Sequence, residues 1–100
     1  MNIVKLNNGK VELRKANGSL IRTLQSSGAI DANINSDGTL IVITNTDGKV
    51  VLRKDSGSLI RTICPSNSVS AKFSWKDFIV TKNNGKMELR KESGSLIRTI

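Results

Sequence analysis

The sequence predicts an all-β fold made of three copies of one unit, and two observations support this prediction. A stretch of eighteen residues occurs three times, as NNGKVELRKANGSLIRTL at 7–24, TDGKVVLRKDSGSLIRTI at 46–63 and NNGKMELRKESGSLIRTI at 83–100. Between its turn signals the chain is rich in β-branched residues and lacks the sustained periodicity of a helix. Repeated units of strands and turns are therefore expected along the whole chain.

Each copy predicts three strands joined by two tight turns. Asn8-Gly9, Asp47-Gly48 and Asn84-Gly85 accept positive φ at both positions, which predicts type I′ hairpin turns. β-type runs precede these dipeptides (IVKL, LIVIT and FIVTK) and follow them (KVELRK, KVVLRK and KMELRK). A second turn at ANG, DSG or ESG then leads into the strand SLIRT.

The segments between the copies each add one more short strand. GAIDANINSDG at 28–38 and NSVSAKFSWKD at 67–77 precede the second and third copies, and nothing equivalent precedes the first. The unit is thus four antiparallel strands in about 38 residues. The sequence predicts eleven strands in a single repeat domain, 1–100, with repeats at 1–24, 25–63 and 64–100, the first of which lacks its first strand.

The second turn of each copy also predicts a strand register. A three-residue loop sets Leu13 opposite Ile21 and Glu12 opposite Arg22, and the third copy repeats this pattern at 88–89 and 97–98. One face of the hairpin is then apolar, and the other carries cross-strand ion pairs.

Composition indicates a protein with anionic partners. Sixteen Lys and Arg residues against eight Asp and Glu residues give a net charge of +8, and the chain has no His. Such an excess attracts nucleic acid, nucleotides or acidic protein surfaces through its long-range field. The longest apolar run, 40–43, is too short to span a membrane, and the first residues do not form a secretory signal. Together with a single cysteine, these features favour a cytoplasmic protein.

Patterns for catalysis or metal binding do not occur in the sequence. Without His, the many Ser and Thr residues have no activating side chain near neutral pH. Cys64 has no visible base partner, and no metal-ligand spacing, P-loop or dinucleotide fingerprint occurs. We therefore expect no enzyme activity, no cofactor and no metal site, and we expect Cys64 to be structural.

Basic residues recur at equivalent positions of the copies and are the candidate ligand-binding residues. They form three sets: Lys10, Lys49 and Lys86; Arg14, Arg53 and Arg90; Arg22, Arg61 and Arg98. In one interpretation, their aliphatic stems pack between sheets while their charged heads reach water. In the other, the sets form a ring or stripe of positive charge that binds phosphates.

The three aromatic residues cluster in one segment, KFSWKDF at 72–78. Basic and aromatic residues in alternation can stack nucleic-acid bases, although such aromatic residues more often belong to a core. We assign Phe73 and Phe78 to the core. We expect Trp75, at a predicted turn, to be exposed and to be a further ligand-binding candidate.

The complete units resemble blades of a WD-repeat β-propeller. NINSDGTLIVITNTDGKVVLRKDSGSLIRTI at 33–63 and KFSWKDFIVTKNNGKMELRKESGSLIRTI at 72–100 show a short strand, a turn, two strands joined by a second turn, a glycine turn and an apolar fourth strand. Arg-Lys stands where the family's third strand ends in Trp-Asp, and without His the family's Gly-His pair is absent. The resemblance implies three propeller-like blades, with the set Lys10, Lys49 and Lys86 on the rim where propellers usually bind ligands.

A propeller ring closes with roughly four to eight blades, so three blades leave two faces open. We therefore expect homo-oligomerisation to close the ring, and our first choice is two copies that associate head to tail to give six blades. A β-trefoil or prism formed by a single chain is the alternative fold.

The predicted function is that of a non-enzymatic binding protein, a basic ring that captures an anionic ligand such as a nucleotide or nucleic acid. Small basic proteins made of near-identical repeats are similar to those of bacterial viruses, which suggests sequestration of a nucleotide or inhibition of a host nucleic-acid enzyme. The alternative is a protein-interaction scaffold with an acidic partner, the commonest role of the propellers that the chain resembles. A third interpretation is a fragment or a duplication product without a selected ligand.

Overall fold

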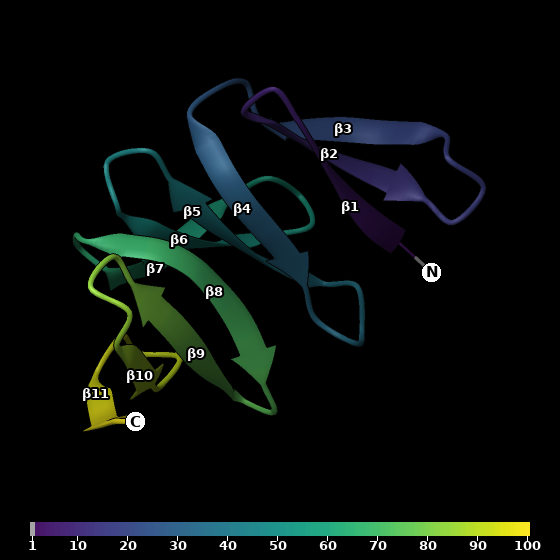
Figure 1. The fold of residues 1–100 in the computed structure, drawn as a ribbon. Helices are drawn as coiled ribbons and strands as arrows, with labels where there is room; N and C mark the ends of the chain where they lie inside the picture. Colours follow the sequence, from purple (N-terminus) through teal and green to yellow (C-terminus); the bar gives the residue numbers. More distant parts are fainter. Residues whose placement is uncertain (1) are drawn as a thin grey trace.

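Three antiparallel sheets follow one another along the chain in the computed structural model, which describes residues 2–100 (Figure 1). The first sheet contains β1 (Asn2–Asn7), β2 (Lys10–Lys15) and β3 (Leu20–Gln25). The second contains β4 (Ala29–Ile34), β5 (Leu40–Asn45), β6 (Val50–Lys54) and β7 (Leu59–Cys64). The third contains β8 (Ser68–Ser74), β9 (Asp77–Lys82), β10 (Met87–Arg90) and β11 (Leu96–Thr99). The all-β class and the antiparallel sheets of three, four and four strands are confirmed.

The first turn of each copy has the predicted type I′ character only in the first sheet. Asn8 and Gly9 both have positive φ, at 51° and 83°, and Asn7 pairs directly with Lys10. In the other two sheets only the glycine has positive φ, and the loops contain three residues, 46–48 and 83–85. The type I′ prediction is wrong there because one added residue lengthens the loop, and such a loop needs positive φ only at its last position.

The predicted register of the second hairpin is wrong by one residue. The loop 16–18 does contain three residues, and Lys15 donates its backbone N–H to Ser19 O at 2.8 Å. Beyond it, Ile21 is an extra residue in a β-bulge, so Leu13 lies opposite Arg22 instead. The third sheet has the same bulge, and Leu89 lies opposite Arg98. A bulge moves every later cross-strand pair by one position.

The core consists of two apolar layers, one on each face of the second sheet. Between the first and second sheets lie Val11, Leu13, Leu24, Ile41, Ile43 and Val51. Between the second and third sheets lie Val42, Val50, Leu52, Ile63, Ala71, Phe78 and Val80. Because β5 is covered on both faces, its residues 41–44 form an unbroken buried run. The assignment of Phe78 to the core is confirmed, and Phe73 packs against the same layer while staying half-buried.

Backbone hydrogen bonds join the sheets at one end, which we call the linker end. It contains the turns β1–β2, β5–β6 and β9–β10 and the two linkers between sheets, 26–28 and 65–67. The bonds run from Ala29 N to Gly9 O, Thr46 N to Gly28 O, Ser68 N to Gly48 O and Asn83 N to Asn67 O, at 2.8–3.0 Å. These bonds hold the three turns side by side. The other turns lie at the opposite end of the strands, which we call the pocket end.

Side chains join β4 to β8, which are not paired as strands of one sheet. Asn33 Nδ2 donates to Ala71 O at 2.7 Å, and Ala71 N donates to Asp31 Oδ2 at 3.2 Å. Two side chains thus satisfy both backbone groups of Ala71, as a neighbouring strand would. Among residues 2–100, no helix is long and apolar enough to cross a membrane.

Candidate functional site

The lysine set Lys10, Lys49 and Lys86 lies at the linker end, where each residue ends one of the hydrogen-bonded turns. All three side chains are exposed. Asp47 is the single carboxylate within these turns, and its Oδ1 accepts a hydrogen bond from the backbone N–H of Lys49 at 2.9 Å. The structure therefore brings three exposed ammonium groups to one end of the molecule, and Lys10 is near enough to Glu12 for their charges to interact.

The second basic set, Arg14, Arg53 and Arg90, stabilises turns at the pocket end. The three side chains are half-buried, and each Nη1 donates to the carbonyl oxygen of the glycine four residues on, at 2.6, 2.9 and 2.8 Å. Arg90 also donates to Ile63 O of the second sheet at 3.4 Å. Because these guanidinium groups are committed within the chain, the interpretation of packed stems and structural contacts fits this set better than phosphate binding.

The ion pairs of the hairpins lie within one strand and not across two. Glu12 was expected to face Arg22, but it lies 2.9 Å from Arg14 on the same strand, and Glu88 lies 2.9 Å from Arg90. The bulge at Ile21 moves Arg22 out of reach. The hydrogen bond from Arg14 lowers the pKa of Glu12, which outweighs the opposing effect of burial.

The second sheet has no carboxylate at the position of these glutamates, because Val51 stands there. Val51 joins the apolar layer against the first sheet. Arg53 Nε is consequently buried without a hydrogen-bond partner among residues 2–100. The middle repeat thus exchanges an ion pair for apolar packing.

The third basic set, Arg22, Arg61 and Arg98, is exposed on β3, β7 and β11, each of which is an edge strand of its sheet. Arg22 Nη1 donates to Ser56 O of the second sheet at 3.1 Å. Exposed leucines precede the arginines by two residues: Leu20, Leu59 and Leu96. This set forms a mixed apolar and basic edge and does not join the lysine set.

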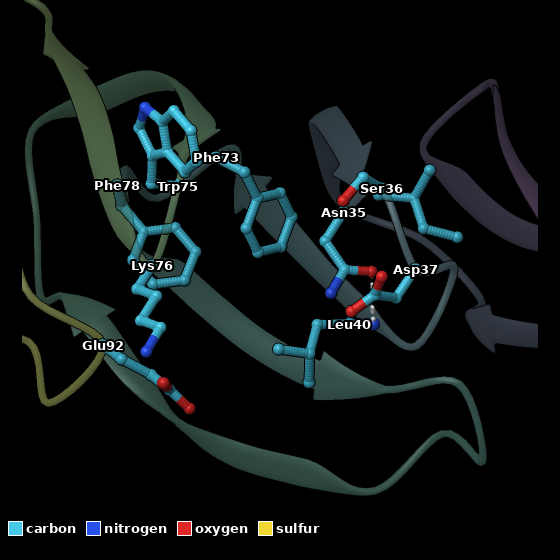
Figure 2. A pocket seen from close by; sticks show the side chains of 10 residues that line it. Asn35, Ser36, Asp37, Leu40, Phe73, Trp75, Lys76, Phe78 and Glu92 are labelled. Carbon is cyan, nitrogen blue, oxygen red and sulfur yellow. Dashed lines mark hydrogen bonds between the residues drawn. The ribbon is translucent and has the colours of Figure 1, made fainter.

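A pocket of about 580 Å³ opens at the pocket end between the second and third sheets (Figure 2). The turns β4–β5 and β8–β9 form opposite sides of it. Phe73 and Phe78 form an aromatic wall, with ring centroids 5.0 Å apart. Figure 2 shows Lys76 and Glu92, from two turns of the third sheet, on one side of the pocket, and Asn35 and Asp37 on the other. The lining combines aromatic, amide and oppositely charged groups, which suits a partner with both polar and apolar features.

Trp75 belongs to this pocket and is 96% exposed, which confirms the expected exposure. Its φ is 58°, a value that few non-glycine residues adopt. Since β9 separates the turn of Trp75 from the turn of Lys86, the structure does not bring the predicted tryptophan and the lysine set together. Sequence reasoning missed the pocket because residues 35–37 and 75–76 are distant along the chain.

Cys64 has a partner that the sequence pattern did not reveal. Lys82 Nζ lies 3.0 Å from the buried Cys64 Sγ and also donates to Ser66 O at 2.6 Å. Burial alone acts to raise the pKa of the thiol, but hydrogen bonds from Ser68 and Lys82 outweigh it and lower that pKa. Sequence spacing did not show this contact, because strand β9 brings Lys82 alongside Cys64. Lys82 donates to the sulfur and is not thereby a base for the thiol.

No cluster of three or more His, Cys, Asp or Glu residues suited to a metal ion occurs within residues 2–100. The chain matches no protein-family model, and no curated protein matches its sequence. The function is therefore inferred from the lysine set, the pocket and the faces of the sheets.

Proposed function

We propose that this protein is a non-enzymatic binding protein of the cytoplasm, a homo-oligomeric, propeller-like ring that captures a phosphate-bearing anion at its linker end. The observation that carries the proposal is the lysine set: three equivalent, exposed ammonium groups on turns that backbone hydrogen bonds hold side by side. Lysine binds phosphate as a point charge and needs no fixed fork geometry. A net charge of +8 strengthens the attraction at long range.

The arrangement of the sheets supports the ring over a β-trefoil or prism formed by one chain. The three sheets share no strand and stack through their faces. Among the described residues, 2–100, the second sheet alone is covered on both faces, so further copies can continue the stack. Two copies give six sheets, which lies within the number that closes a propeller. A ring also multiplies the lysine set, so that one polyanion meets several turns at once.

Replacement of the lysine set tests the proposal. The variant Lys10→Ser, Lys49→Ser, Lys86→Ser should bind a fluorescent single-stranded oligonucleotide more weakly, and the log–log salt slope should fall by about 2 per chain, given about 0.7 per phosphate contact on single strands. The measurement is fluorescence anisotropy between 50 and 200 mM salt. The matched control replaces Lys15, Lys54 and Lys91, three exposed and equivalent lysines at the pocket end, so both variants lose the same charge.

Equal weakening by the two triple variants would show that net charge alone drives binding and would contradict a site at the linker end. A nucleoside triphosphate serves as the second probe because it presents the same phosphate chemistry without a backbone. Tight binding of the triphosphate alone identifies a nucleotide site, whereas binding of the oligonucleotide alone identifies a nucleic-acid surface.

The pocket supports the second candidate function, a protein-interaction scaffold. Trp75 is the most exposed large apolar side chain among residues 2–100, and the pocket beside it is formed by two different sheets. Exposed tryptophan is typical of residues that dominate the energy of protein interfaces. A partner held by Trp75 should keep its affinity between 50 and 200 mM salt, where phosphate binding falls steeply.

A further inference from the structure

The two outer faces of the chain repeat the surfaces that already pack inside it. In the first and second sheets, three apolar positions pack against the sheet that follows. We call these positions, and the equivalent positions of the third sheet, the packing triplet. The packing triplets are Val11, Leu13 and Leu24 in the first sheet, Val50, Leu52 and Ile63 in the second, and Met87, Leu89 and Ile100 in the third. Among residues 2–100 no sheet follows the third, so within this part of the chain its triplet faces outward.

Exposure separates the third packing triplet from the other two. Val11 and Val50 are both 0% exposed, whereas the equivalent Met87 is 38% exposed. Ile63 is 2% exposed, whereas the equivalent Ile100 is 66% exposed. The positions that form the interior of two interfaces therefore form an apolar surface on the third sheet.

The opposite face of each sheet receives the packing triplet of the preceding sheet, and strand pairing identifies its members. We call these positions the receiving triplet. The receiving triplets are Ile41, Ile43 and Val51 in the second sheet, Phe78, Val80 and Glu88 in the third, and Ile3, Lys5 and Glu12 in the first. Among residues 2–100 no sheet precedes the first, so nothing in this part of the chain covers its receiving triplet. Ile3 is 42% exposed, whereas Glu12 is only 7% exposed.

The receiving triplets of the first and third sheets each include a glutamate that forms an ion pair with an arginine. Glu88 holds Arg90 at 2.9 Å, and Arg90 reaches across the sheet interface to Ile63 O. Glu12 holds Arg14 at 2.9 Å in the same way. Arg14 thus occupies, on the uncovered face of the first sheet, the place from which Arg90 reaches Ile63 O in the third.

We propose that two copies associate head to tail, with the packing triplet of the third sheet of each copy docked on the receiving triplet of the first sheet of the other. This inference rests on the self-association included in the proposed function and names its interface. Met87 and Leu89 then pack against Ile3 and the aliphatic stem of Lys5, as Val50 and Leu52 pack against the third sheet. Such an interface is heterologous, and two of them close a symmetric ring.

Two single variants and their mixture test the interface, with mass measured by light scattering. Met87→Asp and Ile3→Asp each place a charge in one half of the interface, and both positions lie outside the buried core of the chain. Each should weaken association at least about a hundredfold, because an unpaired charge would be buried. Leu59→Asp is the control, since Leu59 is 55% exposed on the second sheet, away from both faces.

The mixture decides between interface types. Met87→Asp keeps an intact receiving triplet and Ile3→Asp keeps an intact packing triplet, so the mixture retains one of the two interfaces of the ring. It should form a one-to-one dimer that is weaker than the wild-type dimer, although each variant alone is monomeric. Circular dichroism checks that each variant retains its strands. If one variant does not fold, the mass of the other still tests the interface.

Three outcomes would overturn the proposed interface. They are a monomeric wild type, a Met87→Asp or Ile3→Asp dimer as tight as wild type, and a mixture that associates no more tightly than either variant alone. These measurements contain no phosphate ligand. A dimer that fails to bind the oligonucleotide therefore refutes the proposed ligand and agrees with the proposed interface. A monomer that binds the oligonucleotide refutes the interface and agrees with the proposed ligand.

Discussion

At the scale of single residues, equivalent side chains meet different surroundings. Arg14 and Arg90 are paired with glutamates, whereas Arg53 is beside Val51 and leaves its Nε unpartnered among the described residues. The sequence shows the substitution, but only the packing shows its consequence, which is an apolar layer against the first sheet. Repetition of a sequence therefore does not repeat the energetics of each contact.

The pair Glu12–Arg14 predicts a pH dependence. The hydrogen bond from Arg14 holds the pKa of Glu12 below its ordinary value of 4.5. A carboxyl whose pKa is lower in the folded state stabilises the fold fully above the unfolded value, and this stabilisation is lost as the pH falls through the folded value. An NMR titration of wild type should place the midpoint of Glu12 below 4.5.

Arg14→Gln should raise the midpoint of Glu12, and the exposed Lys15→Gln should leave it nearly unchanged. The variant Glu12→Gln should remove part of the acid-dependent loss of stability measured by urea unfolding. An unchanged midpoint of Glu12 in Arg14→Gln would show that the ion pair is not formed in solution.

At the scale of elements, the strands follow from the sequence, whereas details of a single residue do not. Turn dipeptides and β-branched runs predict all the strands because they act locally. Loop lengths and the bulge at Ile21 depend on strand twist and on the packing between sheets, which are not local properties of the sequence. One extra residue in a strand then moves the cross-strand pairs out of the predicted register. The bonds of Asn33 to Ala71 and of Lys82 to Cys64 are likewise non-local. The exposure of Trp75 was predictable from its turn, but its pocket was not.

The turn of Gly48 tests how tightly the sheets are joined at the linker end. A Cβ at Gly48 would overlap the backbone nitrogen of Asn67, whereas a Cβ at Gly57 would meet nothing within 4 Å. Both glycines have positive φ, so both alanine variants carry a strain of about 1–2 kcal/mol. Gly48→Ala should lose a further 1–3 kcal/mol or so, because backbone cannot move aside as a side chain can.

Urea unfolding of Gly48→Ala and Gly57→Ala measures this difference in the free energy of unfolding. The two positions have similar backbone strain, but only at Gly48 would the added Cβ meet another part of the backbone. Equal losses of free energy would mean that the turn of Gly48 and the linker at Asn67 are not in contact.

At the scale of the whole molecule, residues 2–100 form a stack of three sheets. Its second sheet is buried on both faces, and its outer sheets each leave one face exposed. Charge is also divided between the ends, with the lysine set at the linker end and mixed charges around the pocket. Association through the outer faces would bury the packing triplet of the third sheet and leave both ends free for ligands.

Sedimentation equilibrium of the wild-type protein at micromolar concentration, without any added ligand, tests the central claim most directly. If the outer faces of the first and third sheets are complementary, the mass is that of two chains and falls to one chain in Met87→Asp. A wild-type mass of one chain throughout the concentration range would contradict this account.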